Sequence, residues 1–123
     1  MEFDQSQPIW MQICELLCNR IAAAEWPEQE RIPSVRELGA ALGVNPNTVM
    51  RAYERLTDEE LIFNRRGIGY FVAPEAQARA AATLRRRFER EQLPRIFRSM
   101  RRVGLTADEF VTLYRKFMED ENQ

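Results

Sequence analysis

The sequence predicts a mainly α-helical protein with one small β-hairpin, in which a helix-turn-helix domain is followed by two C-terminal helices. Three patterns support this prediction: two adjoining helix-start signals, two β-prone runs around a glycine-rich turn, and an apolar stripe of helical period in the last third. At 123 residues the chain has room for one small domain and an appendage. We expect residues 1–74 to form the first domain and residues 75–123 the second.

A first helix should open at Pro8 and end before Pro27. Its apolar residues recur at helical spacing and should face the core: Ile9, Ile13, Leu16, Leu17 and Ile21. Cys14 and Cys18 fall on the same side, so we expect buried free thiols, because a disulfide within one helical turn is geometrically awkward. The sequence has no histidine and no second ligand cluster, so we expect no metal and no cofactor.

The helix-turn-helix prediction depends on capping signals. Ser34 and Glu37 have the S-x-x-E spacing of a capping box, in which each side chain bonds a free backbone N–H. Gly43 can end that helix in the left-handed conformation. One residue later Asn45 can cap a new helix, with Pro46 at its first position. Two helices joined by a tight glycine-containing turn are typical of proteins that read DNA.

The second of these helices, about residues 46–58, should bury one stripe and expose a polar face. The buried stripe consists of Val49, Ala52, Tyr53 and Leu56. Asn47, Thr48 and Arg51 are expected together on the opposite side, as a recognition helix requires. Asparagine can pair with adenine, arginine with guanine, and a helix N-terminus favours phosphate. The alternative is an ordinary amphipathic helix. Arg36, on the preceding helix, is either a DNA contact or a solvated arginine.

A β-hairpin is expected next. Residues 61–64 and 70–72 are β-prone, and between them lies Arg65-Arg66-Gly67-Ile68-Gly69, whose glycines suit a turn. A two-stranded ribbon with arginines at its tip, after a helix-turn-helix, is a wing that can enter the minor groove or contact phosphate. The rival interpretation, a nucleotide-binding glycine loop, has weaker support because no helix start follows it.

The charge distribution limits how the chain can bind DNA. The net charge is −1, whereas nucleic-acid-binding domains are usually basic. Residues 1–74 hold seven arginines and eleven acidic residues, a net charge of −4, and residues 75–123 carry +3. DNA binding would therefore depend on a local patch on one face. The arginines of that patch would be Arg36, Arg51, Arg65 and Arg66.

Four short runs occur in a distinctive order: PIWMQI at 8–13, PSVREL at 33–38, VNPNTV at 44–49 and RGIGYFV at 66–72. Together they resemble the N-terminal domain of GntR-type transcriptional regulators over about residues 6–73, and the VNPNTV version with a short C-terminal region is similar to the YtrA subfamily. The resemblance implies a homodimeric winged helix-turn-helix repressor that controls its own gene and often neighbouring transporter genes.

The resemblance also implies roles for individual residues. Arg36 matches the family's phosphate or base contact on the first helix of the pair. Asn47 and Thr48 match recognition-helix contacts, and the wing tip is matched by Arg66 and Gly67.

The sequence departs from the family pattern at two kinds of position. Pro46 and Met50 stand where relatives have arginine, and Arg51 is the candidate replacement. Three other residues stand where relatives often place glycine at turns: Ala24, Gln29 and Glu60. A positive φ at each would cost about 1 kcal/mol. We expect that some of these turns shift instead.

The C-terminal region should form helices with a wide apolar stripe. A helix over residues 75–90 should kink or restart at Pro94 and end at Gly104, and Thr106 with Glu109 forms a second capping box that opens a helix to about residue 119. The residues expected to form a two-fold dimer interface are Leu84, Phe88, Ile96, Phe97, Met100, Phe110, Leu113, Tyr114 and Phe117.

Other interpretations of this region stay open. Packing of the stripe against the first domain would give a monomer. Arg85-Arg86-Arg87 and Arg101-Arg102 are interpreted as solvated or salt-bridged helix faces rather than a second DNA site. A crevice lined by Phe88, Phe97 or Tyr114 could hold an apolar effector, but core packing is the preferred interpretation, and the sequence names no effector.

The sequence therefore predicts a DNA-binding transcriptional regulator that binds a double-stranded operator as a homodimer. An enzyme is disfavoured, because no nucleophile, base and metal ligands converge in the pattern. A winged-helix protein-interaction module is the alternative, and the acidic first domain supports it. No stretch approaches the roughly 18 apolar residues of a membrane span, and no signal peptide is present, so we expect a cytoplasmic protein without a membrane partner.

Overall fold

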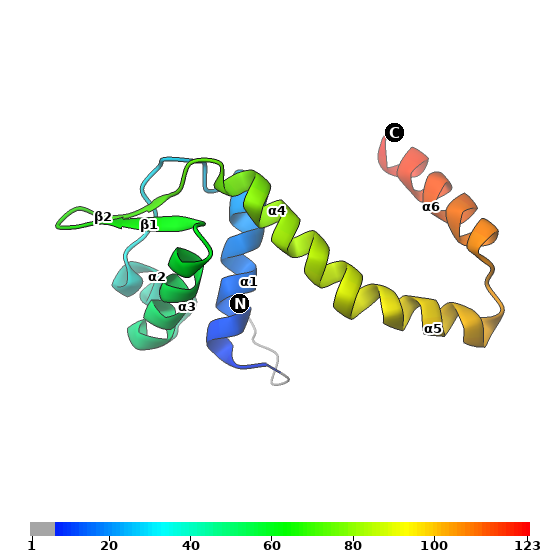
Figure 1. Cartoon of the computed structure of the whole chain (residues 1–123), viewed down its shortest axis with the longest axis horizontal. Coiled ribbons are helices and arrows are strands. Elements are labelled where there is room, and N and C mark those ends of the chain that lie inside the picture. Colours follow the sequence, from blue (N-terminus) through cyan, green and yellow to red (C-terminus); the bar gives the residue numbers. More distant parts are fainter. Residues whose placement is uncertain (1–6) are drawn as a thin grey trace. The chain divides into compact units, whose positions relative to one another are not determined.

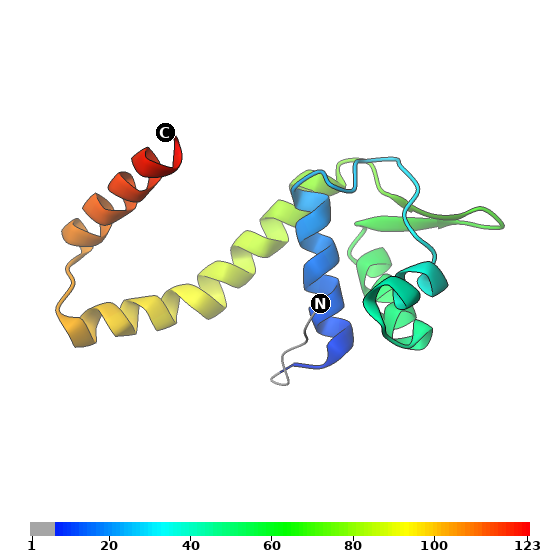
Figure 2. The same cartoon turned by 180° about the vertical axis from the view of Figure 1, so that it is seen from behind.

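The computed structural model describes residues 7–123, which divide into two compact units, residues 7–85 and 86–123 (Figures 1 and 2). Its elements in chain order are α1 (Ile9–Ala22), α2 (Val35–Leu42), α3 (Pro46–Asp58), β1 (Ile62–Arg65), β2 (Gly69–Val72), α4 (Ala76–Arg87), the π-helical turn η1 (Phe88–Gln92), α5 (Leu93–Val103) and α6 (Ala107–Glu121). The first unit thus includes most of α4, which the sequence analysis assigned to the second domain.

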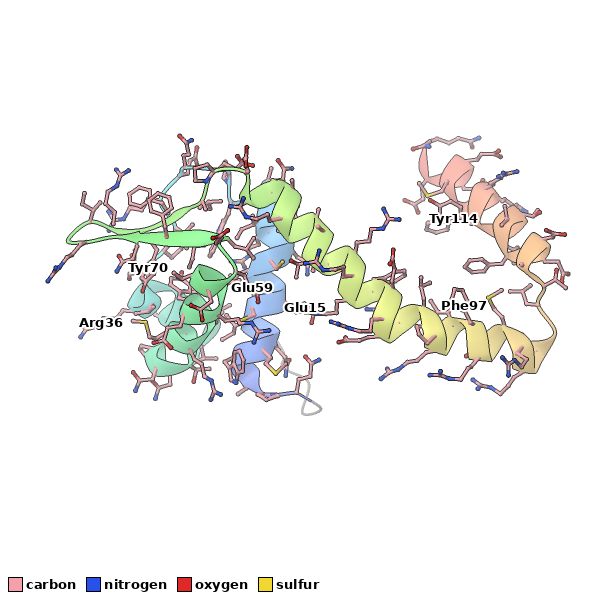
Figure 3. The ribbon with its side chains drawn as sticks, viewed as in Figure 1. Glu15, Arg36, Glu59, Tyr70, Phe97 and Tyr114 are labelled. Atoms are coloured by element: carbon pink, nitrogen blue, oxygen red, sulfur yellow. The ribbon has the colours of Figure 1, made fainter. Side chains whose placement is uncertain are left out.

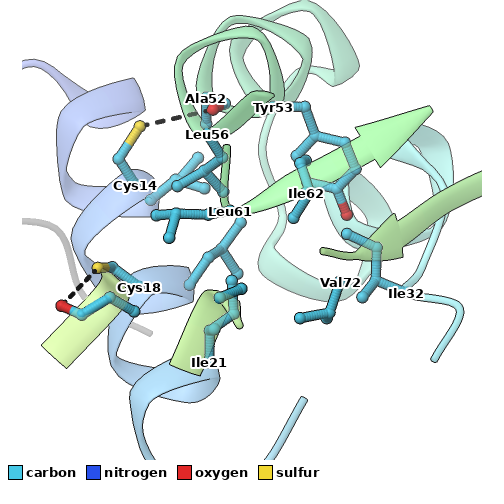
Figure 4. Close-up of a cluster of buried hydrophobic side chains, with 14 of the residues drawn as sticks. Cys14, Cys18, Ile21, Ile32, Ala52, Tyr53, Leu56, Leu61, Ile62 and Val72 are labelled. Carbon is cyan, nitrogen blue, oxygen red and sulfur yellow. Dashed lines mark hydrogen bonds between the residues drawn. The ribbon is translucent and has the colours of Figure 1, made fainter. Parts of the chain in front are cut away.

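The core of the first unit lies between α1, α3 and the hairpin (Figure 4). Ile13, Leu17 and Ile21 of α1 are fully buried, as predicted, whereas Ile9 is 43% exposed because it lies one turn beyond the core. Cys14 and Cys18 are buried free thiols, as predicted. Their Sγ atoms lie 3.6 Å from the carbonyl oxygens of Ala52 and Ala80, so both thiols have acceptors inside the core.

The capping signals of α2 and α3 act as predicted. The Ser34 hydroxyl accepts from the Glu37 N–H at 3.1 Å, and the Glu37 carboxylate accepts from the Ser34 N–H at 3.0 Å. Gly43 ends α2 with φ of 69°, and the Asn45 side chain caps α3. A Cβ on Gly39 would come within 2.9 Å of the Val44 carbonyl, so this glycine lets the turn fold tightly against α2.

The wing is an antiparallel hairpin in which Ile62 pairs with Val72 and Arg65 with Gly69. A third segment, residues 29–32, lies along the other edge of β2. It is held by bonds from the Gln29 N–H to the Val72 carbonyl, from the Val72 N–H to the Glu30 carbonyl and from the Ile32 N–H to the Tyr70 carbonyl. The sequence does not predict this pairing, because residues 29–32 have no alternating apolar pattern. The pairing makes β2 the central strand.

The three positions expected to favour glycine keep positive φ: 59° at Ala24, 67° at Gln29 and 61° at Glu60. The expectation that some of these turns shift is wrong. Tertiary bonds hold at least two of the three. Gln29 donates its N–H to β2, and the Glu60 carbonyl accepts two bonds from the Arg79 guanidinium, at 2.6 and 3.1 Å.

The start of α4 is fastened to the first unit by side chains. The Glu28 carboxylate accepts from the backbone N–H groups of Glu75 and Gln77, which are free donors at the helix N-terminus. Arg79 donates to the Pro74 carbonyl as well as to that of Glu60. Ala76 and Ala80 are fully buried as a result, so the first turns of α4 belong to the core.

The second unit is helical and has no core of its own, because none of residues 86–123 is buried. In η1 the Leu93 N–H bonds the Phe88 carbonyl, five residues earlier. This wider turn precedes Pro94, whose ring would clash with the preceding turn of a regular α-helix, so α5 restarts at Leu93 as expected. Gly104 ends α5 with φ of 74°, and a complete capping box at Thr106 opens α6.

Glu60→Gly is expected to stabilise the protein by about 0.5–1 kcal/mol, because glycine relieves the left-handed strain and loses part of that gain to backbone entropy. The free energy of unfolding from urea titration measures this. The control is Ala81→Gly, at an exposed position inside α4, which should destabilise by about 1 kcal/mol. Equal destabilisation by both variants would contradict the assignment of strain to Glu60.

Candidate nucleic-acid interface

The polar face of α3 changes character along the helix. Asn47 and Arg51 are exposed on one face, and Glu54 and Asp58 follow on that same face one and two turns later. Thr48, predicted on this face together with Asn47 and Arg51, is half-buried and lies at its edge. A polyanion can therefore approach the N-terminal half of α3, where the helix dipole is also favourable, but is repelled by the C-terminal half.

Arg51 does not extend freely from α3. Its guanidinium lies 4.5 Å from the ring centroid of Trp10 on α1, a cation–π contact that holds the arginine at the α1–α3 junction. Met50, at one of the positions where relatives have arginine, is half-buried, and its sulfur lies 3.8 Å from the Tyr70 hydroxyl. The structure thus uses position 50 for packing against the wing, and it restrains Arg51 on one flank of the exposed face.

Arg36 is exposed in the first turn of α2 and projects away from the helices of this unit (Figure 3). Hydrogen bonds from Ser34 lower the pKa of the neighbouring Glu37, so this carboxylate stays ionised and is occupied in the capping box. Among residues 7–123, Arg36 has no carboxylate within ion-pair distance. Its charge is therefore available to a ligand.

The start of α2 is held in place by Tyr53. Burial raises the pKa of the Tyr53 hydroxyl, which therefore stays protonated and donates to the Pro33 carbonyl at 2.6 Å. Its ring also packs edge-on against that of Tyr70 in β2, with centroids 4.9 Å apart. Tyr53 is thus buried, as predicted, and its contacts fix the position of α3 relative to α2 and the wing.

The tip of the wing consists of Arg66, Gly67 and Ile68, all exposed. Gly67 has φ of 80°, and the Ile68 N–H closes the turn on the Arg65 carbonyl at 2.9 Å. Arg65, expected at the tip, is instead the last residue of β1. Its guanidinium lies back over the rings of Phe71 and Phe63, at 5.0 and 5.9 Å from their centroids.

The structure adds one arginine that the sequence analysis did not select. Arg31 is exposed beside β2, and its Nε lies 3.1 Å from the point that a Cβ on Gly69 would occupy. The sequence signal is weak, because only the pairing of residues 29–32 with β2 brings Arg31 to the wing. Among the described residues up to 74, Arg55 forms an ion pair with Glu59. The arginines near α2 and the wing have no carboxylate within ion-pair distance in residues 7–123: Arg31, Arg36, Arg65 and Arg66.

The residues predicted for a dimer interface lie in different environments. Leu84 packs against the core of the first unit. Ile96, Met100 and Phe110 are half-buried and, with other residues of α5 and with Leu105, line a groove of about 350 Å³ within the second unit. The remaining residues are more exposed, at 42–59% of their surface: Phe88, Phe97, Leu113, Tyr114 and Phe117. Figure 3 labels Phe97 and Tyr114.

In residues 7–123, no group of three or more His, Cys, Asp or Glu side chains is arranged to hold a metal ion. None of the helices in that range is long and apolar enough to cross a membrane.

Comparison with known proteins identifies relatives over the whole chain. The HTH-type transcriptional regulator YhcF of Bacillus subtilis is 32% identical over 118 residues, which is 96% of each chain. The HTH-type transcriptional repressor YtrA of the same species is 35% identical over 72 residues, 58% of this chain and 55% of YtrA.

Solved structures agree with this relationship. A GntR-family transcriptional regulator from Bacteroides thetaiotaomicron has a TM-score of 0.78 and 36% identity, covering 93% of this chain and 99% of its own. The DNA-binding domain of AraR in complex with the operator ORR3 has a TM-score of 0.53 and 29% identity, covering 59% of this chain and 86% of its own. The fold is therefore a winged helix-turn-helix with a C-terminal helical region, as predicted.

The model of the family "Bacterial regulatory proteins, gntR family" matches residues 11–72, which contain α2, α3 and the wing. The named relatives are transcriptional regulators, and YtrA-type regulators are among them. This chain belongs to the GntR family of bacterial transcriptional regulators and is similar to its YtrA-type members.

Proposed function

We propose that the chain is a sequence-specific transcriptional repressor that binds a near-palindromic DNA operator as a homodimer. The observation that carries the proposal is the exposure of Arg36, of Asn47 and Arg51 on α3, and of Arg66. Neither Arg36 nor Arg66 has a carboxylate partner within residues 7–123. Two similar structures hold the DNA-binding domain of AraR on operator DNA, and the relative YtrA is named a repressor, which supports the same function here.

The proposed contacts follow from side-chain chemistry. The N-terminal half of α3 enters the major groove, where the Asn47 amide pairs with adenine and Thr48 makes a contact at the edge of the face. Arg51, restrained by Trp10, reaches a phosphate or guanine on the same side. Arg36 binds the backbone at the start of α2, and Arg66 with Gly67 enters the adjacent minor groove at the wing tip.

The homodimer is proposed from the second unit. A helical unit with no buried residue and with eight large apolar side chains at 40–77% exposure is unfavourable in water, and a second copy would cover them. Two-fold symmetry then presents two recognition helices to half-sites about one helical turn apart, which explains the near-palindromic operator. Leu84 is left out of this interface, because it already packs within the first unit.

The resemblance to YtrA-type regulators extends the proposal to the regulated genes. We propose that the operator lies upstream of the chain's own gene and of neighbouring transporter genes. A regulator of chromosomal DNA works in the cytoplasm, which is the proposed location. The proposal requires no small-molecule effector.

The net charge of −4 over residues 1–74 favours a second candidate, a winged-helix protein-interaction module. A gel shift on the chain's own upstream DNA at two salt concentrations separates the two candidates. Binding that prefers this sequence and weakens with salt supports the repressor. Absence of binding at low salt supports the interaction module.

Arg36→Ala and Arg66→Ala should each weaken operator binding about tenfold, because each removes a charged contact to the DNA backbone or groove. Fluorescence anisotropy over a salt series measures both the affinity and its slope against salt. Arg55→Ala is the matched control, because Arg55 is paired with Glu59 on the far half of α3, and it should bind like the parent. Parent-like binding by all three variants would remove these arginines from the interface.

Asn47→Ala and Thr48→Ala should change base preference more than affinity, at a cost of about 1–3 kcal/mol for the preferred base at one position of each half-site. Binding to a panel of single-base operator variants measures the preference of each protein. An unchanged preference in both variants would exclude these side chains from base readout.

Phe97→Asp and Tyr114→Asp should convert a dimer into a monomer, because each places a charge within the exposed apolar surface of the second unit. Sedimentation velocity without DNA measures the mass. Ile68→Asp is the control, since Ile68 is 51% exposed at the wing tip and should leave the dimer intact. A parent protein that sediments as a monomer would overturn the dimer.

A further inference from the structure

The face of the wing turned away from α3 carries two arginines from distant parts of the chain. In the sheet, Phe63 pairs with Phe71 and Arg65 pairs with Gly69, while Arg31 pairs with Phe71 from the other edge of β2. Directly paired residues point to the same face of a sheet, so these five side-chain positions share one face. We call this set the outer wing face: Arg31, Phe63, Arg65, Gly69 and Phe71. Tyr70 points the other way, toward Tyr53 and Met50.

Arg65 is positioned by aromatic rings on this face. The rings of Phe63 and Phe71 stack with centroids 5.6 Å apart and an interplanar angle of 21°. The Arg65 guanidinium lies 5.0 Å from the Phe71 centroid, within cation–π distance. The side chain is therefore held over the strand, and the donors of its guanidinium that do not face the rings remain available.

Arg31 reaches the same area from the opposite edge. Its Nε, Nη2 and Cζ lie 3.1, 3.4 and 3.6 Å from the point that a Cβ on Gly69 would occupy. The guanidinium thus lies in the space left by the missing side chain of Gly69, which itself pairs with Arg65. Arg31 and Arg65 therefore flank Gly69 from its two edges on one face of the sheet.

These two charges have no carboxylate partner in the part of the chain that the structure describes. Glu37 is near enough for Arg31 to help lower its pKa, but its carboxylate is bonded to Ser34. Glu30, next in sequence to Arg31, falls on the opposite side by strand alternation. Two arginines on one face without an ion-pair partner favour binding of an anion such as a phosphate.

We propose that the outer wing face is a phosphate-contact surface for duplex DNA, distinct from the α3 face and the wing tip, with Arg31 and Arg65 as its binding residues. The proposal rests on the proposed DNA-binding function. When the turn at Gly67 enters a groove about 7.5 Å deep, residues 65 and 69, two positions back along each strand, lie roughly 7 Å behind Gly67, at the level of the phosphates that form the groove walls. Arg65 is one of these residues, and the Arg31 guanidinium lies beside the other, Gly69.

Arg31→Ala and Arg65→Ala test the proposal by anisotropy on the chain's own upstream DNA and on a scrambled duplex, over a salt series. Each variant should bind both duplexes about three- to tenfold more weakly, with an unchanged ratio between them. In each variant the plot of log affinity against log salt should become shallower, with a slope smaller in magnitude by about 0.9, the value for one phosphate. Arg31→Gln, of similar length without charge, should behave like Arg31→Ala, whereas Arg31→Lys should recover most of the slope. Arg55→Ala remains the matched control.

Phe71→Leu tests the positioning of Arg65, because leucine keeps the apolar volume and removes the ring face. In a Phe71→Leu background, Arg65→Ala should lose less affinity than in the parent, whereas Arg31→Ala should lose the same. Equal losses in both backgrounds would exclude positioning of Arg65 by the ring.

The outcomes separate this proposal from the one on which it depends. Parent-like binding by Arg31→Ala and Arg65→Ala, together with weak binding by Arg36→Ala and Arg66→Ala, would overturn the outer wing face and leave the repressor proposal standing. Parent-like binding by all four would overturn both. A loss of operator preference without a change in salt slope would overturn the assignment to phosphate.

Discussion

Tyr53 is buried where α3, the start of α2 and the wing meet. Its hydroxyl donates to the Pro33 carbonyl at 2.6 Å, and its ring contacts Tyr70 of β2 edge-on. The surfaces proposed to bind DNA belong to these three elements, so their relative positions depend on this side chain. A phenylalanine would keep the ring contact but leave a part-buried carbonyl without its donor. The geometry of the interface is thus set from within the core.

In the first unit, the positive charge available for DNA comes from a few unpaired arginines and not from the net charge. Residues 1–74 carry a net charge of −4, and the far half of α3 exposes Glu54 and Asp58 on the face that begins with Asn47. Four arginines have no carboxylate partner among the described residues: Arg31, Arg36, Arg65 and Arg66. Such a distribution weakens non-specific attraction to DNA, since that attraction follows total charge, and it leaves orientation-dependent contacts to provide affinity. The acidic balance is therefore compatible with a DNA reader that depends on a small surface.

The two units differ in how far they bury their apolar side chains. The first has a closed core that takes in the start of α4, where Glu28 caps the helix and Arg79 bonds the carbonyls of Glu60 and Pro74. The strained backbone of Glu60 presents its carbonyl to Arg79, so a local cost is offset by a tertiary contact. The second unit has a glycine stop at Gly104 and a complete capping box at Thr106, but none of its residues is fully buried, which is typical of a surface completed by another chain.

The sequence by itself determined the α-helices, the hairpin, both capping boxes and the buried face of α3, because these follow from local signals: caps, glycine stops and apolar periodicity. It also selected Arg36 and Arg66, which the structure leaves exposed. It did not predict the π-helical turn η1. Only the tertiary structure decided the pairing of residues 29–32 with β2, the positive φ at Gln29 and Glu60, and the side-chain positions of Arg31, Arg51 and Arg65. Each of these features depends on a partner at least 12 residues away or on a ring supplied by another element. Capping signals and apolar periodicity report on neighbouring residues only, so they do not predict such contacts.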